Sequence, residues 1–235
     1  MNEYSSIATY AQREMDNLTR KTYAAHQKLV DKIHPGFWVG KRCFIVGGGP
    51  SLKNFDFVRI RREQTIGINR SFEYVPTDLL YFMDHDFYQQ VREQDAWKRF
   101  PGVRVAPSQP VTGLKFDETV YLVWRRLSPI VSTRLEDGVY AGTNSGLGAI
   151  MLAAAIGCKQ IFLLGYDMKT EGDTHWHPGY KNQTASTMDL LFKDYVRDFE
   201  VMAPLLAAAE VEIINLNPES GLNCFKKMNI EELSL

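Results

Sequence analysis

Two histidines lie close together in a polar segment of the chain and are the first candidates for chemistry. His175 and His177 fall within residues 168–180, which follow the apolar run 161–164 and Asp167. A free imidazole titrates near ~6.5, so either side chain could act as a general base near neutral pH. Two imidazoles and a carboxylate could instead bind zinc or another divalent ion. A surface loop with incidental histidines is the third interpretation of this segment.

A cluster of small residues marks a second candidate site. The apolar run 43–46 is followed by three glycines, a proline and a serine at residues 47–51. Glycine has no Cβ and tolerates positive φ, so the backbone N–H groups of such a turn can approach a bound anion. The pattern predicts a buried strand, a phosphate-binding turn and a short helix, or else a plain strand-to-helix turn without a ligand. The predicted contacts to the phosphate are Gly47, Gly48, Gly49 and Ser51.

The glycine turn matches neither of two common phosphate-binding patterns. No Lys-Ser/Thr pair follows the glycines, so the turn is not a Walker P-loop. Leu52 stands where Gly-x-Gly-x-x-Gly would place its third glycine. The phosphate interpretation therefore depends on which other segments meet this turn.

A second helix start is predicted just before the alanine-rich run 149–156. The residues that precede this run include N-cap types and a glycine, and they are Thr143, Asn144, Ser145 and Gly146. The N–H groups at a helix N-terminus attract an anion by ~0.3–1 kcal/mol when exposed and by up to ~2 kcal/mol in a partly buried site. We predict that this helix start and the glycine turn hold one phosphoryl group between them. A capped helix that binds nothing is the alternative.

Polar residues also follow other predicted strands, at the sheet edge where open α/β sheets bind ligands. The predicted contacts to a nucleotide or its substrate are Asn69 and Arg70 after residues 65–68, Asp167 after residues 161–164, and Asn217 and Ser220 after residues 211–215. Asp84 and Asp86 follow the apolar run 79–83. An Asp-x-Asp pair at a strand end could hold Mg²⁺ or Mn²⁺ against a diphosphate, or could simply begin a loop.

Apolar runs and helical patterns alternate along the chain, which predicts an α/β fold: a Rossmann-like open, mostly parallel sheet with helices on both faces. Residues 3–32 have apolar side chains at helical spacing, so we expect residues 1–40 to be a helical extension packed on the core. Residues 41–235 then form one nucleotide-binding catalytic domain. The first helix either covers a sheet edge or makes a contact in a homo-oligomer. Further helices are expected at 87–100 and at 189–209, the latter interrupted near Pro204.

Composition excludes several classes of protein. The 235 residues are 45% hydrophobic, enough for a full core, and 27 basic against 28 acidic residues give a net charge of −1. This balance predicts no nucleic-acid partner. The polar N-terminus predicts no signal peptide, and no apolar run is long enough to span a bilayer. The chain has three cysteines, Cys43, Cys158 and Cys224, which are far apart in sequence and in apolar surroundings. This pattern is typical of reduced thiols in a cytoplasmic protein.

The order of these segments resembles that of the bacterial lipooligosaccharide sialyltransferases. It is equally similar to the related family of motility accessory factors and archaeal 6-hydroxymethylpterin diphosphokinases. The resemblance covers roughly residues 42–222 and rests on residues 47–52, Asn69, 144–146, 161–167 and 217–220. It implies a Rossmann-like fold, a nucleotide phosphate near Asn144 and Ser145, ribose or base contacts near Asn69 and the last strand, and a catalytic histidine after Asp167.

Three functions are compatible with this pattern. The first is a glycosyltransferase of cell-surface glycan biosynthesis that moves a sugar from a nucleotide-activated donor to a glycan or small-molecule acceptor, a sialic-acid-like nonulosonate being one option. The second is an Mg²⁺-dependent diphosphokinase that uses ATP and a pterin-type alcohol, as Asp84 and Asp86 suggest. The third is a non-catalytic nucleotide-binding assembly protein. No organic cofactor is expected in any of them.

Overall fold

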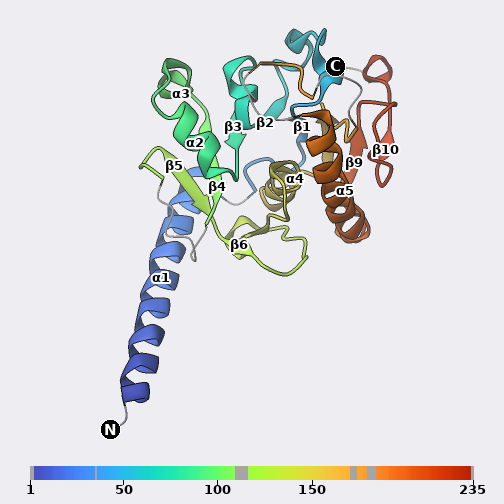
Figure 1. Cartoon of the computed structure of the whole chain (residues 1–235). Coiled ribbons are helices and arrows are strands. Elements are labelled where there is room, and N and C mark those ends of the chain that lie inside the picture. The colour runs from blue at the N-terminus through green and yellow to red at the C-terminus, as the bar shows by residue number, and fades with distance from the viewer. Residues whose placement is uncertain (1–2, 35, 109–115, 170–173, 179–183, 234–235) are drawn as a thin grey trace.

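The computed structural model describes residues 3–34, 36–108, 116–169, 174–178 and 184–233. Its centre is an eight-stranded sheet in the order β10-β9-β8-β1-β2-β3-β4-β5, in which every neighbouring pair is parallel (Figure 1). The predicted α/β class with an open parallel sheet is therefore confirmed. The strands are β1 (Arg42–Val46), β2 (Gln64–Ile68), β3 (Leu79–Tyr81), β4 (Val103–Pro107), β5 (Val120–Val123), β8 (Gln160–Leu164), β9 (Glu212–Asn215) and β10 (Lys226–Lys227). A separate small sheet pairs β6 (Arg125–Arg126) with β7 (Val139–Tyr140).

The direction in which the chain builds the sheet reverses at β1. From β1 the strands proceed through β2, β3 and β4 to β5, whereas β8 and β9 lie on the other side of β1. The register places Val46, the last residue of β1, opposite both Gly67 and Leu164. The carboxyl ends of β1, β2 and β8 are therefore level, and they form the switch point at which open α/β sheets bind ligands.

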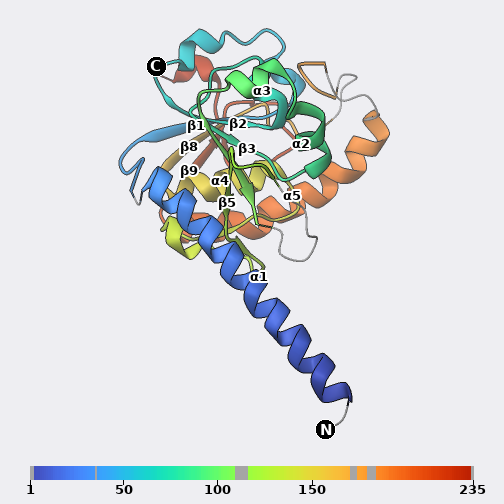
Figure 2. The same ribbon diagram turned by 90° about the vertical axis from the view of Figure 1, so that its left-hand side faces the viewer.

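Both faces of the central strands are buried, which explains their continuous apolar sequences. In β1, Cys43 and Ile45 enter one hydrophobic cluster, and Phe44 and Val46 enter another. The first cluster lies under α1 (Glu3–Ile33), α4 (Ser145–Ala155) and α5 (Ala185–Ala208). The views in Figures 1 and 2 place these three helices on the same side of the sheet.

The opposite face is covered by shorter elements. The helices α2 (His85–Val91) and α3 (Asp95–Arg99) pack over β3 to β5. Turns, short 3₁₀ helices and the C-terminal segment cover β8, β1 and β9. The 3₁₀ helices among the described residues are η1 (Pro50–Leu52), η2 (Phe57–Ile60), η3 (Asn69–Glu73), η4 (Leu135–Asp137) and η5 (Ile230–Glu232). Of these, η4 lies on the first face, where its Leu135 joins the cluster under α1. Helical elements thus flank both faces, as predicted.

The helix α4 lies close against the sheet because its residues are small. Its residues from Leu147 to Ala155 are all buried. A Cβ on Gly148 would overlap the ring of Tyr81 in β3, so only glycine permits this approach. The small residues of α4 therefore set the short distance between its first turns and the carboxyl ends of the strands.

The first helix, α1, extends from the edge of the sheet away from the rest of the molecule (Figures 1 and 2). Its last turns pack into the core through Leu29, Val30 and Ile33. The buried imidazole of His26 joins it to the sheet, because its Nδ1 accepts from the Trp124 backbone N–H at 3.2 Å and its Nε2 lies 3.3 Å from the Glu136 carbonyl. The division into an extension of residues 1–40 and a domain of residues 41–235 stays a prediction.

Several predicted boundaries were wrong in detail. The helix expected at 87–100 is two helices, α2 and α3. The helix α5 begins at Ala185 and continues through Pro204 without a break. A proline removes one intrahelical hydrogen bond, and here the burial of Phe199, Met202 and Leu206 on the sheet holds the helix together across it. No helix among the described residues is both long enough and apolar enough to cross a membrane.

Candidate functional site

A pocket of about 410 Å³ opens at the carboxyl ends of β1, β2, β3 and β8. It brings together most of the predicted site residues, namely Gly47, Gly48, Gly49, Asn69, Asp84, Thr143, Asn144, Ser145, Gly146, Asp167 and His175. The remaining predicted residues are absent from its described lining: Ser51, Arg70, Asp86, His177, Asn217 and Ser220. The glycine turn and the start of α4 thus face one cavity, although they are almost 100 residues apart in sequence.

The glycine turn does not offer its N–H groups to a ligand in the way that the sequence suggested. Gly47 N donates to the Leu164 carbonyl and Gly49 N to the Gly165 carbonyl, both at 2.8 Å. The Gly48 N–H has no hydrogen-bond partner among the described residues. The glycines of the turn have no positive φ either. Of the three glycine N–H groups that were predicted to bind an anion, only that of Gly48 has no partner within the described residues.

A carboxylate of the protein itself occupies the donors that follow the glycines. Asp167 accepts from Ser51 N at 2.7 Å and from Ser51 Oγ at 2.6 Å. Asn217 Nδ2 donates to the same carboxylate at 2.9 Å. Ser51 and Asn217 thus serve to hold Asp167, rather than to line the pocket as predicted.

Close packing explains why the turn consists of glycines. A Cβ on Gly49 would lie 2.6 Å from both the Gly165 carbonyl oxygen and the Asp167 Cγ. A Cβ on Gly48 would lie 2.8 Å from His175 Cδ2. The absence of side chains lets β8, Asp167 and the histidine loop approach the turn.

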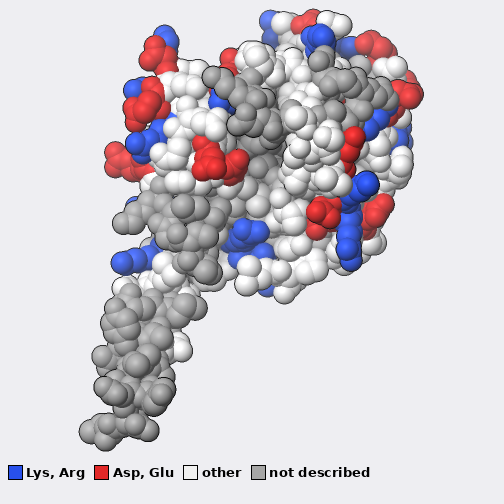
Figure 3. All heavy atoms as spheres, viewed as in Figure 1, with Lys and Arg blue, Asp and Glu red and all other residues white. Residues whose placement is uncertain are grey.

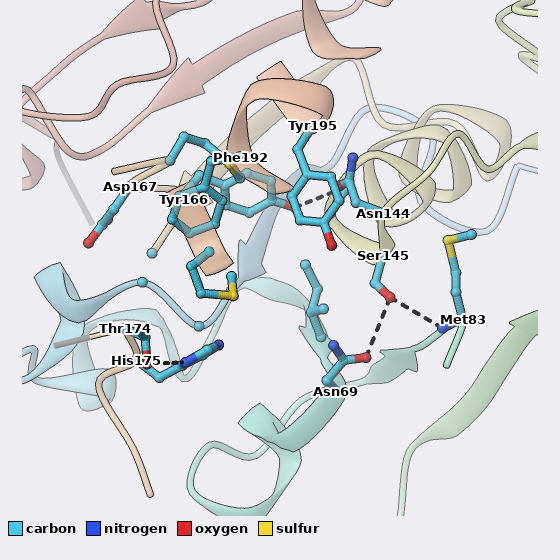
Figure 4. Close-up of a pocket in the computed structure, with 18 of the residues that line it drawn as sticks. Asn69, Met83, Asn144, Ser145, Tyr166, Asp167, Thr174, His175, Phe192 and Tyr195 are labelled. Carbon is cyan, nitrogen blue, oxygen red and sulfur yellow. Dashed lines mark hydrogen bonds between the residues drawn. The ribbon is translucent and has the colours of Figure 1, made fainter. Parts of the chain in front are cut away.

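The start of α4 retains free donors at the pocket. Asn144 caps the helix, because its Oδ1 accepts from Leu147 N at 2.8 Å. The Ser145 hydroxyl accepts from Met83 N at 3.2 Å and lies 3.4 Å from Asn69 Oδ1, which ties α4 to the ends of β2 and β3 (Figure 4). Within the described residues, the N–H groups of Ser145 and Gly146 have no hydrogen-bond partner. These two N–H groups, at the positive end of a helix of 11 residues, form the most favourable place for an anion in the pocket.

Thr143 does not offer its donors to an anion, because a carboxylate of α5 accepts hydrogen bonds from them. Its backbone N and its Oγ1 both donate to Asp198 Oδ2, at 2.7 and 2.6 Å. Its donors are therefore engaged, although the residue lines the pocket.

The charges around the pocket are unusual for a nucleotide site. Two carboxylates line it, Asp84 and Asp167, and no lysine or arginine does so among the residues described. Asp84 Oδ1 accepts from Asp86 N at 2.8 Å and so caps α2, while both side chains are exposed. In the described part of the chain, no three histidine, cysteine or acidic residues gather to hold a metal ion. A metal at Asp84 and Asp86 stays a prediction.

His175 reaches the pocket from the side opposite Ser145 and Asn69 (Figure 4). Its Nδ1 lies 3.1 Å from Thr174 Oγ1, and its Cδ2–Nε2 edge faces Gly48. Burial, helped by the neighbouring His177, lowers the pKa of His175 to about 4. The imidazole is therefore neutral at pH 7 in the protein without a ligand.

His177 is buried beside the pocket and has a different environment. Its ring stacks on Tyr74 with centroids 5.2 Å apart, and its Nδ1 lies 3.1 Å from the Pro178 carbonyl. Burial lowers its pKa, and the Arg70 guanidinium lowers it further. Of the two histidines predicted as alternative bases, His175 lines the pocket, whereas His177 is buried and absent from its described lining.

Two other predicted contacts are occupied within the protein. Arg70 pairs with Glu73 at 2.6 Å and donates to Gln90 Oε1 at 3.1 Å. The Ser220 hydroxyl donates to the Tyr166 carbonyl at 2.6 Å. Both side chains thus fix the surrounding backbone.

The helix α5 supplies a wall of the pocket that the sequence analysis missed. Met188, Phe192 and Tyr195 line it, and Figure 4 shows Phe192 and Tyr195 at its edge. They are spaced four and three residues apart, so they share one face of the helix, and this spacing is the signal that could have revealed them. Burial raises the pKa of Tyr195, and Asp84 and Asp194 raise it further.

Backbone strain is concentrated at the same place. Among the described residues other than glycine, positive φ occurs at Asn69 (49°), Met168 (50°) and Glu210 (58°). Asn69 and Met168 line the pocket. Strained backbone that the surrounding fold maintains is a common property of ligand sites.

Comparisons with known proteins provide a distant structural match. The chain matches no protein-family model and no curated protein sequence. Among solved structures, it is similar to a mutant of the alpha-2,3/8-sialyltransferase CstII, with 14% sequence identity and a TM-score of 0.44. The match covers 80% of this chain and 86% of the sialyltransferase. Similarity at this level does not assign an activity to the chain.

Substitution of Gly48 and of Gly49 by alanine tests how tightly each position of the turn is packed. We expect Gly49→Ala to lower the free energy of unfolding by about 1–3 kcal/mol, because its Cβ meets backbone and a buried carboxylate. Gly48→Ala should cost less, because only the imidazole of His175 must move. Urea denaturation of both variants measures the difference. Equal losses of stability would contradict this account of the turn.

Proposed function

We propose that this protein is a glycosyltransferase that transfers a sugar from a nucleotide-activated donor to a glycan or small-molecule acceptor. The observation that carries the proposal is that an imidazole and a helix start with free N–H groups face the same pocket. Together they can catalyse a group transfer: the imidazole removes a proton from the acceptor, and the N–H groups stabilise the leaving anion.

The leaving phosphate is proposed to lie at the start of α4. The N–H groups of Ser145 and Gly146 point along the helix axis and favour negative charge. The free N–H of Gly48 can add one more donor. Asp167 already fills the donors of Ser51, so a second anion at that end of the turn would meet a carboxylate.

His175 is proposed to be the general base, with Nε2 as the atom that accepts the proton of the acceptor hydroxyl. A pKa of about 4 makes the imidazole neutral but only weakly basic before the donor binds. A bound anion raises the pKa of a nearby imidazole, because it stabilises the charged form. Binding of the donor would therefore raise the pKa of His175 before the acceptor reacts.

The absence of cationic side chains from the described lining favours a donor with one phosphate. A diphosphate or triphosphate carries more charge than a few N–H groups can balance, and proteins usually meet it with Lys, Arg or Mg²⁺. We therefore favour a nucleoside monophosphate as the leaving group, with a nonulosonate as one option for the sugar. The diphosphokinase alternative needs ATP and Mg²⁺ near Asp84, and binding measurements separate the two.

A thermal-shift panel of CMP, CDP, UDP, GDP and ATP, each with and without Mg²⁺, tests the donor class. A nucleotide at about 100 times its dissociation constant adds ~2.7 kcal/mol of stability, or roughly 5–11 °C for a chain of this size. We expect the rise with CMP and no metal. A rise confined to ATP with Mg²⁺ would contradict the glycosyltransferase proposal and support the diphosphokinase.

Replacement of His175 tests the assigned base. We expect His175→Ala to lower the rate of sugar transfer by at least ~10²-fold, because general-base catalysis is lost. Donor binding should persist, since the phosphate is held at α4. The exposed His34 provides the control variant His34→Ala. Full activity in His175→Ala would remove the histidine from the mechanism.

A further inference from the structure

The described residues around His175 form no helix or strand. Residues 174–178 are bends and irregular chain, and His175 lies within them. A base must be held within a fraction of an ångström of its productive position. Some contact other than secondary structure must therefore set the position of the imidazole.

Trp176 makes that contact with two carbonyls of the glycine turn. Its backbone N donates to the Gly48 carbonyl at 3.1 Å, and its indole Nε1 donates to the Gly47 carbonyl at 3.0 Å. The residue next to His175 is thus bonded to the turn that the imidazole faces. The two bonds leave little freedom for the loop to slide along the turn.

An aromatic cluster holds the indole in place from the other side. The Trp176 ring lies 5.1 Å from Phe57 and 5.3 Å from Tyr74, measured between centroids. The His177 ring meets it edge-on at 4.9 Å and stacks on Tyr74. Phe57 begins η2, Tyr74 directly follows η3, and His177 belongs to the loop itself, so three separate segments fix one indole.

We propose that Trp176 is a positioning residue that locks His175 against Gly48 and so sets the proton-accepting edge of the pocket. The catalytic consequence rests on the proposed function, whereas the positioning itself does not. The same lock keeps the imidazole partly buried and near His177, with ring centroids 6.0 Å apart. Release of the indole therefore exposes His175 and alters its titration.

The test uses Trp176→Phe, which keeps an aromatic ring and removes the indole N–H donor to Gly47. Trp124→Phe is the matched control, because Trp124 is also half-buried and lies beside α1. Imidazole NMR of the full chain without ligand follows the titration of each histidine. In the wild type, burial keeps the pKa of His175 at about 4; the neighbouring His177 lowers it further, and Asp167 lines the same pocket.

In Trp176→Phe we expect the titration of His175 to move upward towards ~6.5, the value of a free imidazole. The titration of His26, which is remote from this loop and packed against Trp124, should stay unchanged. In Trp124→Phe the titration of His175 should be that of the wild type. An unchanged His175 titration in a folded Trp176→Phe protein would overturn the proposal. If that variant does not fold, Trp176→Tyr, whose side chain is longer than that of Phe by one hydroxyl and also lacks the indole N–H, provides the same comparison.

Turnover then separates this inference from the proposed function. If the protein transfers a sugar, Trp176→Phe should lower kcat by ~10–10²-fold and leave donor binding intact. If no donor is turned over, the NMR titration still decides whether Trp176 positions the imidazole. If Trp176→Phe changes the titration of His175 but not kcat, Trp176 positions the imidazole and His175 is not the base.

Discussion

The site depends on the position of one carboxylate, that of Asp167. It accepts hydrogen bonds from the backbone and hydroxyl of Ser51 and from the amide of Asn217, so it joins the segments that follow β8, β1 and β9. Because a protein carboxylate already fills these donors, a ligand anion would find repulsion there rather than binding. The free donors at the start of α4 are left as the place for negative charge. The described donors at the Asp167 end of the pocket are thus engaged within the protein, and we propose that an anion binds instead at the start of α4.

The parallel sheet explains how these parts meet. β1 pairs with β8 on one side and β2 on the other, so three strand ends open into one space. The small residues of α4 let its first turn descend to that level, and α5 closes the space with Phe192 and Tyr195. Figure 3 shows acidic and basic side chains interspersed over this face of the molecule. We therefore assign the proposed recognition of a charged ligand to the pocket.

The sequence predicted the fold class correctly, because it follows from local patterns, and most of the predicted site residues line one pocket. Apolar runs ending in polar residues identify parallel strands and their ligand-binding edge. The choice of hydrogen-bond partners could not be predicted. Gly47 and Gly49 resemble anion donors in sequence, but the carbonyls at the end of β8 accept their hydrogen bonds. Only the register of β1 and β8 decides this pairing. The roles of His177 and Trp176 likewise depend on rings brought together from distant segments.

Amide NMR with the nucleoside monophosphate CMP tests the central claim most directly, because it reports each backbone N–H separately. If the phosphate binds at the start of α4, the amide signals of Ser145 and Gly146 should shift most on titration, and that of Gly48 should follow. The amides of Gly49 and Ser51, which donate within the protein, should move little. The largest shifts at Gly49 and Ser51, with silent amides at Ser145 and Gly146, would contradict the account.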